Sequence, residues 1–123
     1  MAGYLTTHVL DLARGCPAAG VRVELWRLDD ATGSSRVCLV TTRTNADGRP
    51  DEPLLTGSDF TAGTYELLFD VGEYFAHHEA TTAATTLSFL NHVTVRFSVA
   101  DPTTHYHVPL LVTPWAYSAY RGS

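Results

Sequence analysis

The sequence predicts an all-β fold, a sandwich of short strands. Apolar and polar residues alternate with period two through most of the chain, most clearly at residues 21–28, where Val21, Val23 and Leu25 occupy every second position. Residues two apart in a strand point to the same side, so this alternation is typical of a strand buried on one face. Gly, Pro, Asp and Asn separate these segments at short intervals, which is typical of a sandwich.

The N-terminal part of the chain contains three expected strands. Residues 4–10 (YLTTHVL) are rich in β-branched and aromatic side chains, which favour strands. The Gly and Pro residues within 11–20 indicate a loop, and the strand at 21–28 follows it. After the turn at 29–35, residues 36–44 (RVCLVTTRT) form the third expected strand.

The rest of the chain begins with a tight turn at residues 45–50, in which Gly48 suits a positive φ. Residues 72–82 (GEYFAHHEATT) are the only segment with the composition of a helix, and it is short. The Asp-Pro pair at 101–102 is a further turn signal. Four more strands are expected, at residues 64–71, 93–99, 105–112 and 116–120.

Length and charge limit the possible functions. At 123 residues the chain is expected to form a single domain, residues 1–123, with a core large enough to need no disulfide. The net charge of −5 and the absence of a basic cluster argue against nucleic acid and against an anionic membrane surface. All eight basic residues are arginine, so Schiff-base or P-loop lysine chemistry is excluded.

The cysteines and the N-terminus point to a reducing compartment. Cys16 and Cys38 are the only two cysteines, and they lack the short spacing of a metal site or a disulfide framework. The first residues lead directly into an alternating segment, without a charged region followed by an apolar one, so no signal peptide is expected. No apolar run approaches membrane-spanning length. The expected location is therefore cytoplasmic.

Histidines supply the first candidate site residues. His105 and His107 stand two apart at the start of an apolar run, and in a strand they share one face. They are either hydrogen-bonded strand histidines or two ligands of a metal that needs a further ligand, for which His8 is available only if its strand is adjacent. Arg49, in an Asp-Gly-Arg turn, adds a cation. No nucleophile motif accompanies these residues, which favours a site that uses water.

The chain end supplies the second set of candidates. A terminus without a docking role is usually small and polar. This one keeps Tyr120 and Arg121 next to Gly122 and Ser123, so we expect it to be docked against another surface.

Several segments carry a family resemblance. They are residues 5–11 (LTTHVLD), 15–18 (GCPA), 45–49 (NADGR), 105–111 (HYHVPLL) and 120–123 (YRGS). Together they resemble the 5-hydroxyisourate hydrolases, the transthyretin-related enzymes of urate breakdown, over essentially the whole chain. Transthyretin, the hormone carrier, lacks the histidine at position 8 and the YRGS ending, so the resemblance favours the enzyme.

The resemblance implies a transthyretin-like sandwich of two four-stranded sheets with one short helix. It also implies a homotetramer, a dimer of dimers, with active sites in a channel between dimers to which several subunits contribute. The substrate it implies is 5-hydroxyisourate, whose six-membered ring is opened by hydrolysis of a ring amide without a cofactor or a resident metal. The docked tail would then line a subunit interface.

The resemblance also suggests roles for the candidate residues. His8 or His105 would activate the water, and His107 would orient its partner or donate a proton. Arg49 would hold the carbonyl and anionic edge of the substrate. Tyr120 and Ser123 would position substrate or water, Gly122 would line the substrate site, and Arg121 would anchor the tail or contact the substrate.

Three other interpretations of the sequence stay open. The first is a carrier that binds a small ligand without catalysis, which would not require His8, Arg49 and His105. The second is a metal protein that uses His105 and His107. The third is a structural sandwich with an edge-strand interface.

Overall fold

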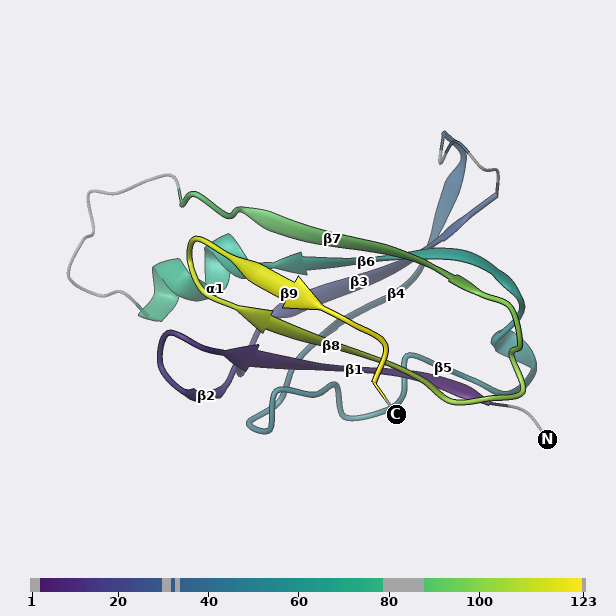
Figure 1. The fold of residues 1–123 in the computed structure, drawn as a ribbon, viewed down its shortest axis with the longest axis horizontal. Coiled ribbons are helices and arrows are strands. Elements are labelled where there is room, and N and C mark those ends of the chain that lie inside the picture. Colours follow the sequence, from purple (N-terminus) through teal and green to yellow (C-terminus); the bar gives the residue numbers. More distant parts are fainter. Residues whose placement is uncertain (1–2, 30–31, 33, 79–87, 123) are drawn as a thin grey trace.

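A computed structural model describes residues 3–29, 32, 34–78 and 88–122. Two β-sheets pack face to face, and a short helix closes one end of the sandwich (Figure 1). One sheet has the strand order β2-β1-β8-β9, with β5 also paired to β1, and the other has the order β4-β3-β6-β7. The sandwich of two sheets with one helix is therefore confirmed, and one sheet gains a fifth, two-residue strand.

The elements follow the alternation of the sequence closely. The strands are β1 (Tyr4–Asp11), β2 (Cys16–Pro17), β3 (Arg22–Leu28), β4 (Arg36–Arg43), β5 (Leu55–Thr56), β6 (Gly63–Asp70), β7 (His92–Val99), β8 (Tyr106–Val112) and β9 (Tyr117–Ala119). The helices are α1 (Val71–His78) and a single 3-10 turn, η1 (Gly57–Asp59).

The differences from the expected elements are small and local. Every expected strand is present with ends that move by one residue at most, whereas β2, β5 and η1 were not expected. These three elements have two or three residues each, too few to show periodicity in a sequence. The helix begins one residue before the expected start, and residues 79–82 of the expected helix lie outside the described residues.

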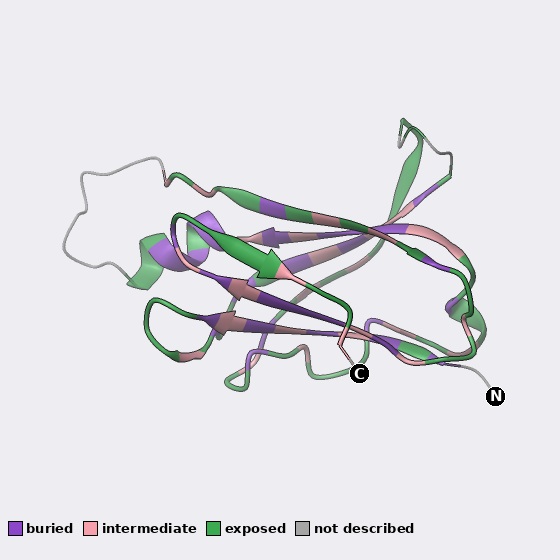
Figure 2. Ribbon diagram, in the orientation of Figure 1, coloured by how far each residue is buried: buried purple, intermediate pink, exposed green. Residues whose placement is uncertain are grey.

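Buried residues alternate with less buried ones along β1 and β3, whereas β4 and β9 contain none that is buried (Figure 2). In β1 the buried residues are Leu5, Thr7, Val9 and Asp11, so Thr6 and His8 lie on the opposite face. That opposite face carries the polar positions considered below. No helix in the described part of the chain has the length and apolar composition needed to cross a bilayer.

Strand pairing brings the two histidine segments together. Strands β1 and β8 run parallel at the centre of their sheet, with Thr6 paired to His107 and His8 paired to Pro109. In this register the outward side chains of β1 lie beside those of β8. The central position of β1 and β8 thus gives the polar face a rigid backbone.

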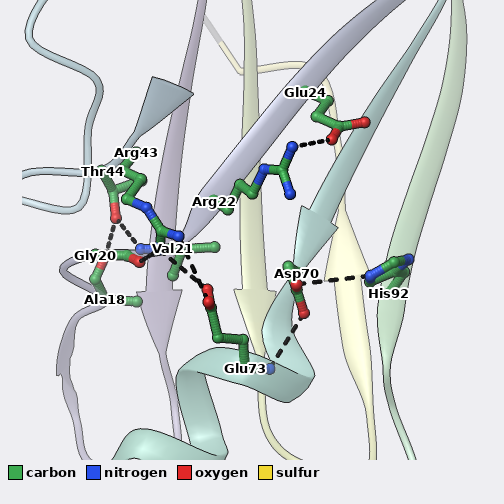
Figure 3. Close-up of polar contacts among 10 residues, drawn as sticks. All are labelled: Ala18, Gly20, Val21, Arg22, Glu24, Arg43, Thr44, Asp70, Glu73 and His92. Carbon is green, nitrogen blue, oxygen red and sulfur yellow. Dashed lines mark hydrogen bonds and ion pairs between the residues drawn. The ribbon is translucent and has the colours of Figure 1, made fainter. Parts of the chain in front are cut away.

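Polar contacts hold helix α1 at the far end of the sandwich (Figure 3). The Asp70 carboxylate accepts a hydrogen bond of 3.1 Å from the Glu73 amide in the first turn, and Arg43 pairs with the Glu73 carboxylate at 3.0 Å. Beneath the helix, the Tyr74 hydroxyl donates to the buried Asp11 carboxylate at 2.7 Å. Burial raises the pKa of Tyr74 to about 12, so this hydroxyl keeps its proton and stays a donor.

Candidate active site

A cleft on the outer side of the β1–β8 pair brings together three of the predicted site residues. Its volume is about 410 Å³, within the range of small-molecule sites. Two imidazoles from β8 and its approach, and the guanidinium of the 45–50 turn, line the same space. The lining residues are Thr6, Thr7, Arg49, Pro50, Asp51, Glu52, Pro53, His105 and His107.

Thr6 lies between the two histidines of this cleft. Its Oγ1 is 2.8 Å from His105 Nε2 and 2.8 Å from His107 Nδ1. The His105 ring also stacks on Tyr4, with ring centroids 4.1 Å apart. Both imidazoles are therefore fixed by contacts from β1, as a site that moves protons requires.

His8 lies beside the cleft, and the residues that line the cleft do not include it. Its Nε2 is 2.8 Å from the carbonyl oxygen of Asp47. Because a carbonyl only accepts, Nε2 carries a proton, and in neutral His8 the lone pair is then on Nδ1. Burial, together with the nearby Arg49 charge, lowers the pKa of His8 below its usual value, so the ring is neutral at pH 7.

His107 has a similar environment. Burial lowers its pKa first, and the Arg49 charge lowers it further, as would a proton on His105 or His8. The shared influence of Arg49 places its guanidinium within electrostatic reach of both rings. The site therefore holds two neutral imidazoles beside one permanent cation.

The turn that carries Arg49 is built around Asn45. The Asn45 amide donates to the Arg49 carbonyl at 2.8 Å, and the Asn45 side-chain oxygen accepts from the Asp47 amide at 2.8 Å. The Gly48 carbonyl accepts from the Val9 amide at 2.8 Å, which fastens the turn to β1. This fastening places the Asp47 carbonyl at His8 and Arg49 at the cleft.

Gly48 is needed for this close approach. Its φ is +79°, and an added Cβ would lie 2.4 Å from the Val9 carbonyl oxygen and 3.2 Å from the His8 ring. We expect Gly48→Ala to lower the free energy of unfolding by about 1–3 kcal/mol, the usual cost of a strained backbone conformation. We also expect it to displace the His8 ring. Urea denaturation measures the first effect. Gly20→Ala has a similar φ of +81° but open space around the Cβ, so it controls for the backbone strain alone.

The tail lies against the same strand. The Gly122 amide donates to the His107 carbonyl at 2.6 Å, and these two residues form an isolated bridge. The Arg121 guanidinium lies 3.9 Å from the centre of the Tyr106 ring. Tyr120 is 55% exposed and lines, with Arg121, a separate groove outside the cleft. Ser123 lies outside the described residues.

Within one chain the predicted site residues are thus only partly brought together. His105, His107 and Arg49 share the cleft, His8 adjoins it, and Gly122 lies against His107. Among the described residues, no three His, Cys, Asp or Glu side chains gather as metal ligands would. In addition, His105 Nε2 and His107 Nδ1 are both engaged with the Thr6 hydroxyl.

Sequence reasoning missed two features of the site. One is the Thr6 hydroxyl between the histidines, and the other is the Asp47 carbonyl that fixes His8. Thr6 could have been found from the sequence, because it stands two residues before His8 and therefore lies on the same face of the strand. The role of the Asp47 carbonyl could not, because every residue has a backbone carbonyl.

On a sandwich of two sheets, a cleft lined by two imidazoles and a guanidinium is suited to bind a small polar molecule and to exchange protons with it. The sequence profile of the HIUase/Transthyretin family matches residues 5–122. The chain belongs to this family. It is 53% identical over 125 residues to the 5-hydroxyisourate hydrolase of Deinococcus radiodurans, with all of both chains covered.

Solved structures agree with this assignment. (S)-Allantoin synthase superposes with a TM-score of 0.88 at 44% identity, covering 99% of this chain but only 44% of that longer chain. Transthyretin from Sparus aurata superposes with a TM-score of 0.78 at 27% identity, covering 96% of this chain and 95% of that one. The fold is thus shared by proteins with different names, so function has to be argued from the site.

Proposed function

We propose that this chain is an enzyme that hydrolyses 5-hydroxyisourate in urate degradation. The observation that carries the proposal is the convergence of His105, His107 and Arg49 on one cleft with His8 beside it. A carrier of an apolar ligand has no use for neutral imidazoles next to a fixed guanidinium. The hydrolase name of a relative that matches the whole chain at 53% identity supports the same activity.

His8 acts as the base in this proposal. Its Nε2–H is held by the Asp47 carbonyl, so Nδ1 is free to take a proton from water. Its lowered pKa keeps that lone pair available at neutral pH. The resulting hydroxide attacks the carbonyl carbon of the ring amide, and the carbon–nitrogen bond then breaks as the leaving nitrogen is protonated.

His107 and Arg49 serve the other two needs of the reaction. His107 lines the cleft and donates the proton to the leaving nitrogen, while His105 orients it through Thr6. Arg49 binds the carbonyl and anionic edge of the substrate with its planar donors, which stabilise the oxyanion as it forms. General acid–base catalysis of this kind typically accelerates a reaction by a factor of about 10²–10⁴.

The tail completes the proposed site. Gly122 holds the chain end against the backbone of His107, and Arg121 fixes it on Tyr106. We assign Tyr120, Gly122 and Ser123 to positioning substrate or water, with Arg121 as anchor and second substrate contact. Because Tyr120 and Arg121 lie outside the cleft of their own chain, these contacts are made across a subunit interface.

A tail that serves a neighbouring subunit requires an oligomer, and the family resemblance favours a homotetramer. Light scattering after gel filtration should give a mass near four times that of the chain, and a monomer with full activity would contradict the shared site. A cytoplasmic location fits the free thiols of Cys16 and Cys38, which form no disulfide.

The activity is tested by ultraviolet spectroscopy on freshly generated 5-hydroxyisourate. Adding the protein should accelerate loss of the substrate band far beyond its spontaneous decay, and prior treatment with a chelator should leave the rate unchanged. Saturable binding with decay at the spontaneous rate would identify a carrier instead. No binding and no acceleration would leave a structural role.

Arg49→Gln is expected to reduce kcat/KM at least about tenfold, since the oxyanion loses a charged donor. It should also raise the pKa of His8 and of His107, because the Arg49 charge lowers both in the folded protein. Histidine proton resonances followed against pH by NMR measure this shift. In the wild type both rings should titrate below 6.5, so protonation on acidification disfavours the folded state and stability is lost as pH falls below 6.5.

Arg121→Gln is the matched control for Arg49→Gln. The Arg121 charge does not influence the pKa of His8 or of His107, so neither pKa should change in this variant. If Arg49→Gln left both titrations in place, the assigned proximity of the guanidinium would be wrong.

A further inference from the structure

The Thr6 hydroxyl occupies the space between the two imidazoles of the cleft. Its distance to each facing nitrogen, His105 Nε2 and His107 Nδ1, is 2.8 Å, within the range of a good hydrogen bond. The contacts join segments 99 and 101 residues apart in the chain, so they are a product of the β1–β8 pairing. The Thr6 hydroxyl is part-buried, and Thr6 is one of the residues that line the cleft.

A hydroxyl has one proton and can donate it to only one of the two rings. If it donates to His107 Nδ1, then His105 Nε2 has to donate to the hydroxyl oxygen. An unprotonated Nε2 would place its lone pair against the lone pairs of that oxygen, with no proton between them. Neutral His107 then carries its own proton on Nε2, as neutral His105 does. In the reverse arrangement both rings carry their proton on Nδ1. The two rings are therefore expected to hold the same tautomer.

We propose that Thr6 is a positioning residue that couples the tautomers of His105 and His107 and relays a proton between them. The proposal rests on the hydrolase function above and adds the path by which the proton donor is resupplied. Thr6 touches the two imidazoles, and its action on the substrate runs through them.

The relay balances proton by proton. His107 gives its Nε2 proton to the leaving nitrogen and at the same time accepts the Thr6 hydroxyl proton at Nδ1. Thr6 accepts the Nε2 proton of His105, and His105 takes a proton from solvent at Nδ1. Each group gains one proton and loses one, so neither ring becomes charged and both change from one matched tautomer to the other. The reverse sequence resets the pair.

The surroundings favour a relay that builds no charge. His107 is partly desolvated, and the neighbouring Arg49 charge opposes a second proton on it. Because His107 accepts a proton at Nδ1 while it loses one from Nε2, it becomes neither an imidazolium cation nor an imidazolate anion. Stacking on Tyr4 and the tail contact at Gly122 hold the two rings in place on either side of Thr6.

Thr6→Val and Thr6→Ser test the proposal together. Valine keeps the shape and strand preference of threonine but has no hydroxyl, whereas serine keeps the hydroxyl. Thr6→Val should lower kcat about 10–100-fold with KM changed less than about twofold, since the loss falls on proton transfer. Thr6→Ser should keep kcat within about threefold of the wild type, because the relay atom is restored. Thr94→Val, on an exposed position of β7, controls for removing a strand hydroxyl.

A second measurement needs no substrate. Long-range proton–nitrogen NMR correlations on ¹⁵N-labelled histidine report which ring nitrogen carries the proton. At mildly alkaline pH, the wild type and Thr6→Ser should show His105 and His107 in the same tautomer or in equal tautomer populations, and Thr6→Val should lose this match.

The outcomes separate this inference from the proposed function. Opposite tautomers in the wild type, or full kcat in Thr6→Val, would overturn the relay, and so would a Thr6→Ser variant as slow as Thr6→Val. Matched tautomers in a wild-type protein that does not hydrolyse 5-hydroxyisourate would uphold the coupling and reject the function.

Discussion

Replacing His8 by asparagine is expected to lower kcat/KM for 5-hydroxyisourate by about 10²–10⁴-fold, the usual contribution of a positioned general base. Asparagine is shorter than histidine: its amide ends at the level of Nδ1, so it does not reach the Asp47 carbonyl that His8 Nε2 contacts at 2.8 Å. The substitution therefore removes the proton acceptor at Nδ1 together with the contact at Nε2. Initial rates of ultraviolet loss at several substrate concentrations measure the effect.

The pH profile gives this prediction a second readout. The neutral base is retained below the usual histidine range, because burial and the Arg49 charge lower the pKa of His8. Wild-type kcat/KM should therefore fall only as pH drops below 6.5, and His8→Asn should lose that acid limb along with the rate. His77→Asn, an exposed histidine on α1, is the matched control and should behave as the wild type. Wild-type rates in His8→Asn would remove His8 from the mechanism.

Deleting residues 120–123 is expected to abolish turnover while the sandwich stays folded. Residues 120–122, the described part of the tail, contribute no side chain to the buried core, so far-UV circular dichroism and the unfolding transition should be close to those of the full chain. Its loss removes the Gly122 contact to His107 and the Arg121 contact to Tyr106, and with them the proposed positioning groups. The same spectroscopic assay measures the loss.

Two further variants divide the effect of the deletion. Arg121→Gln weakens the anchor on Tyr106 and keeps the chain length, so it should reduce kcat/KM less than the deletion does. Deleting Ser123 alone tests the last residue separately. The mass of each variant in solution should be measured too, because a tail that serves a neighbouring subunit can also hold the assembly together. A truncated protein with normal turnover would show that the tail has no part in the site.

Much of the fold could be read from local patterns. The alternation in β3 predicted which of its side chains are buried, and Val23 and Leu25 are indeed in the core. The same rule puts Thr6 and His8 on one face of β1, and the structure shows that this face is the outward one. The two-residue strand β2 could not be predicted, because its pairing with the end of β1 is decided by the loop between them and leaves no periodic signal.

The candidate site shows the same division. The shared face of His105 and His107 was predictable from their spacing, and the shared face of Thr6 and His8 from the alternation of their segment. Their meeting was not, because it depends on the parallel β1–β8 register between residues about a hundred positions apart. The separation of Tyr120 and Arg121 from the cleft of their own chain was also beyond the sequence, since it depends on the turn of the chain after β9.

The sequence by itself determined the class of fold, the sheet faces on which the histidines lie and the family to which the chain belongs, because alternation and short motifs are local properties of a chain. Only the tertiary structure decided that Thr6 stands between two imidazoles, that the Asp47 carbonyl fixes the protonated nitrogen of His8, and that one guanidinium lowers the pKa of two histidines. Hydrogen bonds and charge–charge interactions depend on distances between segments far apart in the chain, and those distances exist only once the sheets have paired.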